Sequence, residues 1–199
     1  MKKFRNQLEL PACACVYYCE GVMNMISAAV PGADRALRLE QWVSDYSDAV
    51  LRTCFVYLSD AALAEDAMQD TFLKAWRSMD TFEGRNGCSE KTWLLRIAIN
   101  VCHSYARSRW FRHVDLRRTL DTLPAAYQTI FPEDRSLFLD ILRLPEKYKQ
   151  MILLYYYQDL TLEECAQVLS VSRSAAHQRL KKAQALLRPT LTGRDQYER

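Results

Sequence analysis

The sequence contains few of the residues that interrupt helices. Its 199 residues include only five Gly and six Pro, and segments that alternate β-branched and polar residues, as strands do, are scarce. It has no run of eighteen or more apolar residues, so no membrane-spanning helix is expected. These absences argue against a β-rich protein and against insertion into a membrane, and they predict an all-α fold.

The chain also lacks the residue patterns on which catalysis depends. No nucleophile–base pair, Gly-rich phosphate loop or set of metal ligands can be recognised in the sequence. His103 and His113 have no metal-ligating neighbours at usual spacings. We therefore expect neither an enzyme nor a bound cofactor.

The seven Cys residues fall into two groups. Cys13, Cys15 and Cys19 could bind a soft metal or act as a redox pair, but no fourth ligand lies at a usual spacing. The favoured interpretation of residues 1–35 is a poorly ordered extension. The other four are dispersed, as expected for reduced thiols of a cytoplasmic protein: Cys54, Cys88, Cys102 and Cys165.

The net charge of +3 is small, and its distribution is more informative than its size. Acidic residues gather between Asp60 and Asp70, whereas basic residues gather from Arg96 to Arg118 and again from Arg173 to Arg188. A chain with one acidic and two basic surfaces can bind a basic protein surface and a polyanion separately.

The most informative segment begins at Leu160. Thr161 and Glu164 have the spacing of a capping box, which predicts that a short helix begins after Thr161. Residues Leu169–Val171 predict a tight turn, and Ser172 can cap a second, longer helix. A short helix, a turn and a longer helix form a helix-turn-helix unit.

The second helix of this unit is expected to end before Pro189. It carries five basic residues and no acid, and its first turns offer small polar side chains. Polar side chains can read base edges in a major groove while basic ones contact phosphates. The alternative is a helical hairpin with a solvated basic face.

A second charged helix is predicted from Ala61 to Met79. Acids in its first turns suit the helix dipole, but an acidic face flanked by aromatics is also typical of a protein-docking surface. Both interpretations remain open from these residues. The residues expected on or beside this face are Glu65, Asp66, Gln69, Asp70, Phe72, Lys74 and Trp76.

A polar loop from Asp80 to Lys91 follows, with a turn at Arg85-Asn86, and Ser89 is expected to cap the next helix. Basic residues interleaved with aromatics on that helix suit single-stranded nucleic acid, although a solvated basic helix is the alternative. Its predicted buried stripe is Trp93, Leu94, Ile97, Ala98, Val101 and Tyr105.

Helical periodicity is lost after the third helix and returns at Ser136. The pattern therefore predicts two small helical domains joined by a flexible linker. The expected divisions are an extension (1–35), an N-terminal domain (36–116), a linker (117–135), a C-terminal domain (136–190) and a tail (191–199).

These segments, in this order, resemble the extracytoplasmic-function (ECF) group of bacterial RNA polymerase sigma factors. In the first domain the resemblance rests on AEDAMQDTFLKAW (64–76) and TWLLRIAINVCHSYAR (92–107). In the second it rests on LPEKYKQMILLYYYQDLTLEECAQVLSVS (144–172) and RLKKAQALLR (179–188). The resemblance implies an N-terminal helical bundle that docks on core polymerase and opens the −10 promoter element, and a C-terminal helix-turn-helix domain that reads the −35 element.

The resemblance also implies site residues. Those facing the clamp helices of the largest polymerase subunit would be Asp66, Gln69, Asp70, Phe72 and Lys74. Those at the −10 element would be Arg85, Asn86, Lys91, Asn100, His103, Ser104 and Arg107. Those at the −35 element would be Ser172, Arg173, Ser174, Ala175, His177, Gln178, Arg179, Lys181 and Lys182. The flap of the second-largest subunit is a further expected contact, and an anti-sigma factor is a partner that no residue here demonstrates.

The sequence departs from the family pattern at several positions, and two alternative functions remain. The positions are Ser170, Ala175, Ala176, His177 and His103. Ser170 stands where the family usually has Gly in the helix-turn-helix turn, and left-handed backbone there would cost about 1 kcal/mol relative to Gly. The same helix-turn-helix could serve a stand-alone regulator acting as a dimer. The chain could also be an adaptor that has lost DNA reading, although its basic recognition helix speaks against this.

Overall fold

The computed structural model describes residues 33–82, 88–107 and 135–194, and every regular element within these ranges is a helix. The expected all-α fold is thus confirmed. Residues 1–32 of the predicted extension, the Arg85-Asn86 turn and nearly all of the predicted linker lie outside the described residues, whereas residues 33–35, also placed in the extension, begin α2.

The chain divides into two compact units, and each is considered by itself. The N-terminal unit contains α2 (Ala33–Leu58), α3 (Ala61–Arg77), the short 3-10 helix η1 (Met79–Thr81) and α4 (Glu90–Arg107). The C-terminal unit contains α7 (Arg135–Arg143), α8 (Glu146–Ile152), the π-helical segment η4 (Leu153–Tyr157), α9 (Leu162–Val168) and α10 (Arg173–Arg194).

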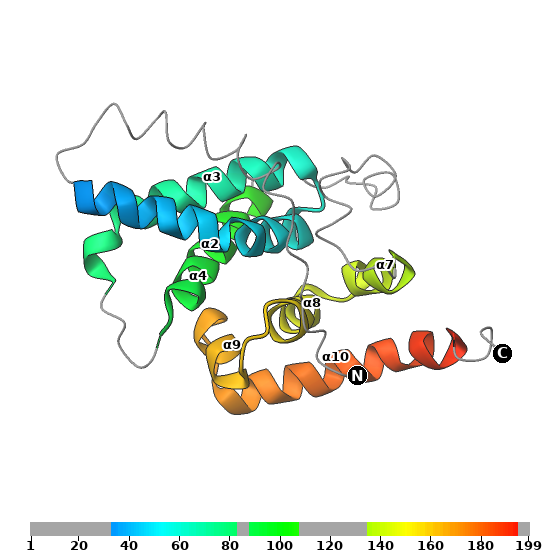
Figure 1. Ribbon diagram of the computed structural model, residues 1–199. Coiled ribbons are helices and arrows are strands. Elements are labelled where there is room, and N and C mark those ends of the chain that lie inside the picture. Colours follow the sequence, from blue (N-terminus) through cyan, green and yellow to red (C-terminus); the bar gives the residue numbers. More distant parts are fainter. Residues whose placement is uncertain (1–32, 83–87, 108–134, 195–199) are drawn as a thin grey trace. The chain divides into compact units, whose positions relative to one another are not determined.

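In the N-terminal unit, α2 and α3 run alongside each other and α4 crosses them (Figure 1). Two residues make the turn between α2 and α3. Ser59 has left-handed backbone (φ 55°), and the Asp60 carboxylate accepts a hydrogen bond of 3.0 Å from the backbone N–H of Leu63. Such a cap stabilises a helix by about 1 kcal/mol, so the break expected at these residues is confirmed.

The buried face of α4 differs from the predicted stripe. Leu94, Ala98 and Val101 are buried as expected, but the predicted Trp93, Ile97 and Tyr105 are only half-buried. Residues one position further along complete the core instead: Leu95, Ile99 and Cys102. The reason is that α4 packs against both α2 and α3. Its buried face is therefore wider than the stripe expected for a helix with one packing partner, and it is rotated by about one residue from that stripe.

In the C-terminal unit, α10 runs beneath α9, α8 and α7 in the view of Figure 1 and packs against all three. The apolar face predicted for α7 is buried. After α8 the backbone widens into η4, which shifts the register of the following residues. Tyr155, predicted in the core, is therefore only half-buried, and Tyr156 is buried in its place.

The helix-turn-helix forms as the sequence predicts. The Thr161 hydroxyl accepts from the backbone N–H of Glu164, whose carboxylate accepts from the N–H of Thr161 at 2.8 Å. Ser170 has φ 51°. In that turn Ser170 N–H donates to the Gln167 carbonyl and Val171 N–H donates to the Ala166 carbonyl, the pairing of a Schellman motif. These bonds offset the cost of a left-handed Ser.

The end of α10 contradicts the expected stop before Pro189. The helix continues to Arg194. A proline has a φ value that a helix accepts, and its cost comes from one missing N–H donor and crowding against the preceding turn. Buried contacts of Ala183 and Leu187 hold the preceding turns of α10 in place, and the chain remains helical beyond the proline.

Candidate protein-docking and nucleic-acid surfaces

The acidic face of α3 is open to solvent at its centre. The side chains of Asp66 and Lys74 are exposed, and those of Gln69 and Asp70 are half-buried. Ala64, Ala67, Met68 and Thr71 lie on the opposite side, in the core. The structure thus brings four of the five predicted docking residues to one accessible helix face.

Phe72 is the exception. The sequence predicts it at the edge of the exposed face, but its side chain is only 1% exposed and lies among the largest fully buried residues. Burial of an aromatic ring of this size is strongly favourable and leaves no surface for a partner. The expectation that Phe72 contacts polymerase directly is wrong.

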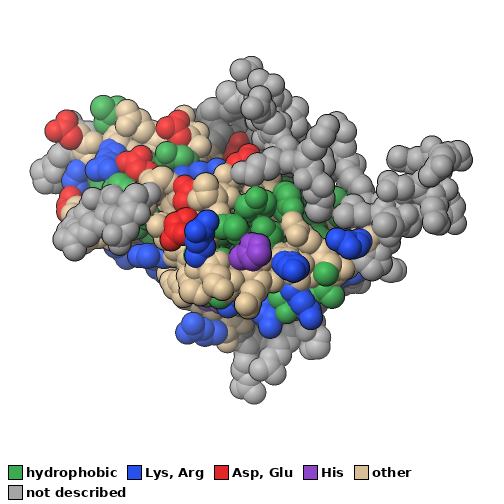
Figure 2. Space-filling view, turned by 90° about the horizontal axis from the view of Figure 1, so that it is seen from below, with side chains coloured by type: hydrophobic (Ala, Val, Ile, Leu, Met, Phe, Trp, Pro, Cys, Tyr) green, Lys and Arg blue, Asp and Glu red, His purple; other side chains and the backbone are tan. Residues whose placement is uncertain are grey.

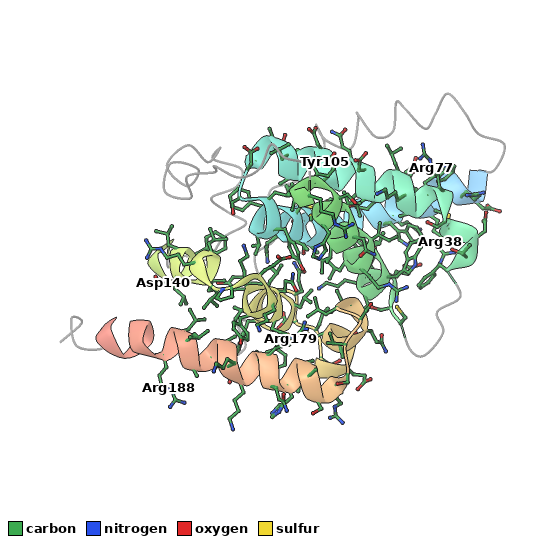
Figure 3. The ribbon with its side chains drawn as sticks, turned by 180° about the vertical axis from the view of Figure 1, so that it is seen from behind. Arg38, Arg77, Tyr105, Asp140, Arg179 and Arg188 are labelled. Atoms are coloured by element: carbon green, nitrogen blue, oxygen red, sulfur yellow. The ribbon has the colours of Figure 1, made fainter. Side chains whose placement is uncertain are left out.

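Asp70 is tied to the neighbouring helix. The hydroxyl of Tyr105, on α4, donates a hydrogen bond of 2.9 Å to Asp70 Oδ2. Burial, followed by this hydrogen bond, raises the pKa of Tyr105 above its usual range. The phenol therefore stays protonated at neutral pH and donates to the carboxylate. Figure 3 shows Tyr105 beside α3, reaching it from α4.

The far half of α4 offers a polar face. Asn100, Ser104 and Arg107 are exposed and recur at intervals of four and three residues, so they lie on one side of the helix. His103 is half-buried, with its ring 5.7 Å from that of Tyr57 in an edge-on arrangement. Lys91, at the other end of α4, is also half-buried.

The start of α10 is the most open of the predicted surfaces. Its first turn contains no acid, and Ala175 N–H donates to the Ser172 hydroxyl at 3.2 Å, which confirms the predicted cap. Ala175 and Arg179 are half-buried. The other predicted residues are exposed: Ser172, Arg173, Ser174, His177, Gln178, Lys181 and Lys182.

In Figure 2, Lys and Arg side chains are spread over the face in view, and Asp and Glu side chains gather toward one side of it. Among the described residues, Glu163 of α9 lies 3.7 Å from Arg173 of α10, with both side chains largely exposed. A pair this long and this exposed contributes little. Arg173, Lys181 and Lys182 are therefore exposed enough to reach a polyanion.

The structure also brings together one group of residues that the sequence does not predict. Arg35 and Arg38, in the first turns of α2, contact Asp80 and Glu90 across the bundle. Their spacing of three residues predicts a shared helix face, but nothing in the sequence indicates which acids they reach. Only the folded arrangement of α2, η1 and α4 brings these groups together.

The sequence also predicts no metal site and no membrane-spanning helix. Among the residues that the structure describes, no group of three potential metal ligands comes together. In the same part of the chain, none of the helices combines the length and the apolar character needed to cross a membrane. Cys13, Cys15 and Cys19 lie outside it.

Two family models match the chain, one on each compact unit. Sigma-70 region 2 matches residues 42–112, and Sigma-70, region 4, matches residues 141–187. The first match covers α3, η1 and α4 and most of α2, and the second covers α8, η4 and α9 and most of α10.

Similar proteins agree with these matches. The ECF RNA polymerase sigma factor SigW of Bacillus subtilis is 28% identical over 164 residues, which cover 75% of this chain and 86% of SigW. The RNA polymerase sigma-E factor of Streptomyces coelicolor is 28% identical over 160 residues, covering 80% and 89%.

Solved structures show the same fold. The sigma factor RpoE of Bartonella quintana, solved with the anti-sigma factor NepR, matches with a TM-score of 0.61 at 23% identity and covers 77% of this chain and 96% of its own. CnrH, solved with the cytosolic domain of CnrY, matches with a TM-score of 0.60 at 21% identity, covering 89% and 96%.

Proposed function

The chain belongs to the ECF group of bacterial RNA polymerase sigma factors, which direct promoter-specific transcription initiation, and we propose how its surfaces divide that work. The proposal rests on which unit each family model matches. Sigma-70 region 2 matches the unit that carries the acidic face, and Sigma-70 region 4 matches the unit that carries the basic helix.

The exposed face of α3 docks on the clamp helices of the largest polymerase subunit. Asp66 and Lys74 make contacts at the accessible centre, and Gln69 and Asp70 contribute from half-buried positions. The Tyr105 hydroxyl holds the Asp70 carboxylate in one orientation, which lowers the entropy lost on binding. Phe72 supports this face from within the core.

The −10 element is opened and held by the polar face of α4. Asn100, Ser104 and Arg107 supply hydrogen-bond donors, acceptors and a charge toward the unpaired strand, with His103 beside them. Lys91, together with Arg85 and Asn86, contributes further contacts to the same strand. Extruding a base from the duplex costs a few kcal/mol, and contacts to the freed strand offset this cost.

The −35 element is read as a duplex by α10. A helix N-terminus without acids is favourable for phosphate, and the exposed residues that follow it reach base edges and the DNA backbone. Arg173, Lys181 and Lys182 supply positive charge, while Ser174, His177 and Gln178 supply hydrogen-bonding groups. Ser172, Ala175 and Arg179 complete the surface.

The physical principle is the linkage of two weak DNA contacts. Residues 36–116 act as the polymerase and −10 domain, and residues 136–190 act as the −35 domain. When one domain is bound, the linker keeps the other at high effective concentration, so that the two contacts together exceed either alone. Polymerase supplies the catalytic chemistry, and the factor works in the cytoplasm, where the polymerase is.

A stand-alone helix-turn-helix regulator is the less favoured function. Such a protein needs no counterpart of sigma region 2, yet that model matches residues 42–112. It would also bind its operator in the absence of polymerase. The docking face on α3 has no role in that alternative.

Transcription in vitro tests the proposal. Purified core polymerase is incubated with fragmented genomic DNA, with and without the full-length chain, and transcript start sites are mapped. We expect a defined set of starts that appears only with the chain. Starts that do not depend on the chain, or a footprint that forms without polymerase, would overturn the proposal.

A further inference from the structure

A hydrogen bond ties α10 to the π-helical segment η4. The side-chain amide of Gln184, on α10, donates from Nε2 to the Tyr156 hydroxyl at 2.6 Å, between residues 28 positions apart in the sequence. Tyr156 is buried and Gln184 is half-buried, so the bond lies at the edge of the interface and is partly shielded from water. A hydrogen bond has a preferred direction, and this one therefore favours one relative setting of the two elements.

The π-helical turn brings Tyr156 to this position. In η4 the N–H of Gln158 donates to the carbonyl of Leu153 at 3.0 Å, a spacing of five residues. A turn of this kind contains one residue more than an α-helical turn and changes the register of the side chains. Tyr156 consequently occupies the buried position that the helical pattern of the sequence assigns to Tyr155, whose ring packs edge-on against it at 5.0 Å.

The buried contacts of α10 are apolar. Among the described residues of this helix, the buried side chains are Ala176, Leu180, Ala183 and Leu187. Burial of apolar surface is non-directional, and the small Ala side chains offer a neighbouring helix little to interlock with. The bond to Tyr156 therefore adds a directional constraint on how far α10 is rotated about its own axis.

Gln184 lies on the same side of α10 as part of the proposed DNA-reading surface. It follows Lys181 by three residues and His177 by seven, the spacings that bring side chains to one helix face. The surface of a helix lies about 5–6 Å from its axis, so a rotation of about 10° moves its side chains by about 1 Å. A shift of this size disturbs a hydrogen bond to a base edge, whereas the attraction between a cation and a phosphate tolerates it.

We propose that Tyr156, through Gln184, is a positioning residue for base reading by α10, because it sets the rotation at which the reading side chains meet the major groove. The inference rests on the proposed function, in which α10 reads the −35 element as a duplex. Tyr156 is buried and acts through α10 without touching DNA. Its loss should lower discrimination between base sequences and leave attraction to the phosphate backbone intact.

The test uses the full-length chain assembled with core polymerase. Tyr156→Phe keeps the ring and removes the hydroxyl, and Gln184→Met keeps an unbranched side chain and removes the amide. Tyr148→Phe is the matched control, because Tyr148 is a half-buried tyrosine of the same unit that takes no part in the bond to α10. Two labelled duplexes are compared at several salt concentrations: the upstream segment of a promoter mapped by the transcription experiment, and a shuffled duplex of the same base composition. Affinity for core polymerase is measured alongside.

We expect Tyr156→Phe and Gln184→Met each to reduce the ratio of the two DNA affinities by about five- to tenfold, close to the value of one good contact to a base. The double variant should be no worse than either single variant, because both changes break the same bond. Affinities for the shuffled duplex and for core polymerase should stay within about twofold of wild type, with an unchanged salt slope. Tyr148→Phe should match wild type throughout.

Unchanged discrimination by Tyr156→Phe overturns the inference, and so does an equal loss of affinity for both duplexes, which indicates a general loss of structure. A double variant whose loss is the product of the two single losses also overturns it, since the two side chains then act separately. A wild-type holoenzyme that does not distinguish the two duplexes contradicts the proposed function itself, which keeps the two failures apart.

Discussion

The two units present their proposed binding residues in different ways. In the N-terminal unit, Asp70 is bonded to Tyr105, and His103 packs on Tyr57. On α10, most of the proposed DNA-binding side chains are exposed. There the Ser172 hydroxyl caps the helix, and Arg173 is paired with Glu163 at 3.7 Å while both side chains stay largely exposed.

The difference follows from what each unit has to bind. Duplex DNA is a preformed surface, and exposed, adaptable side chains suffice to read it. Capturing an unpaired strand costs free energy, because its bases must first leave the duplex. Side chains that are already held in their binding positions offset more of this cost, since less conformational freedom is lost on binding. We therefore expect substitutions in the N-terminal unit to alter stability and binding together, and those on α10 to alter binding alone.

The largest effect is expected from Phe72→Ala. Removing a fully buried phenyl ring should lower the free energy of unfolding of the N-terminal unit by about 3–5 kcal/mol. Urea unfolding followed by Trp fluorescence measures this unit alone, because all four Trp residues precede position 115. Leu186→Ala, at an exposed position of α10, is the control and should change nothing. A loss below about 1 kcal/mol would show that Phe72 is not a core residue.

The next effect concerns the exposed basic residues of α10. Replacing Lys181 and Lys182 by Ala should weaken holoenzyme binding to promoter DNA roughly tenfold or more, and lower the slope of log affinity against log salt by about one per lysine. Thermal stability should stay within about 0.5 kcal/mol of wild type, because both side chains are exposed. A weaker affinity with an unchanged salt slope would rule out phosphate contacts at these positions.

A smaller effect is expected from Tyr105→Phe, which removes the hydrogen bond to Asp70. Affinity for core polymerase should fall by about two- to fivefold, in line with the modest net value of one partly exposed hydrogen bond. Asp66 is left unchanged in this variant and keeps the charge of the face. An affinity equal to that of wild type would show that the orientation of Asp70 does not matter for docking.

The same tyrosine predicts a pH dependence. Its pKa is raised in the folded chain by burial and by the bond to Asp70, so its contribution to stability is complete below about pH 10, the unfolded value. It is lost as pH rises through the folded pKa. Wild-type stability should therefore decline more steeply above about pH 10 than that of Tyr105→Phe, and parallel curves would contradict this.

The smallest effect is expected from Ser170→Gly in the helix-turn-helix turn. Glycine relieves the left-handed strain at φ 51° but has more freedom in the unfolded chain, so the net gain should be about 0.5 kcal/mol. A thermal melt followed by circular dichroism should show a higher midpoint for the C-terminal unit, while the Trp signal from the N-terminal unit does not move. A lower midpoint would show that the Ser side chain itself stabilises the turn.

The sequence predicted best those features that depend on neighbouring residues. The capping box at Thr161, the cap at Ser172 and the turn at Ser170 each involve residues within a few positions of one another, so local chemistry determines them. The predicted end of α10 before Pro189 is wrong. The helix continues through the proline to Arg194.

Features that depend on packing were predicted less well. Phe72 was placed at the edge of an exposed face because one helix considered alone does not show how many partners cover it, and two helices pack against α3. The pairing of Tyr105 with Asp70 and of Arg38 with Glu90 joins residues 35 and 52 positions apart. No spacing rule within a single helix reaches that far.

If α3 binds polymerase and α10 binds DNA, a charge reversal on each of the two helices should affect polymerase binding differently. The affinity for core polymerase, without DNA, is compared for Asp66→Lys and Lys182→Glu, two charge reversals at exposed positions. We expect a loss of more than about tenfold for Asp66→Lys and a change within about twofold for Lys182→Glu. Equal losses, or a greater loss for Lys182→Glu, would contradict it.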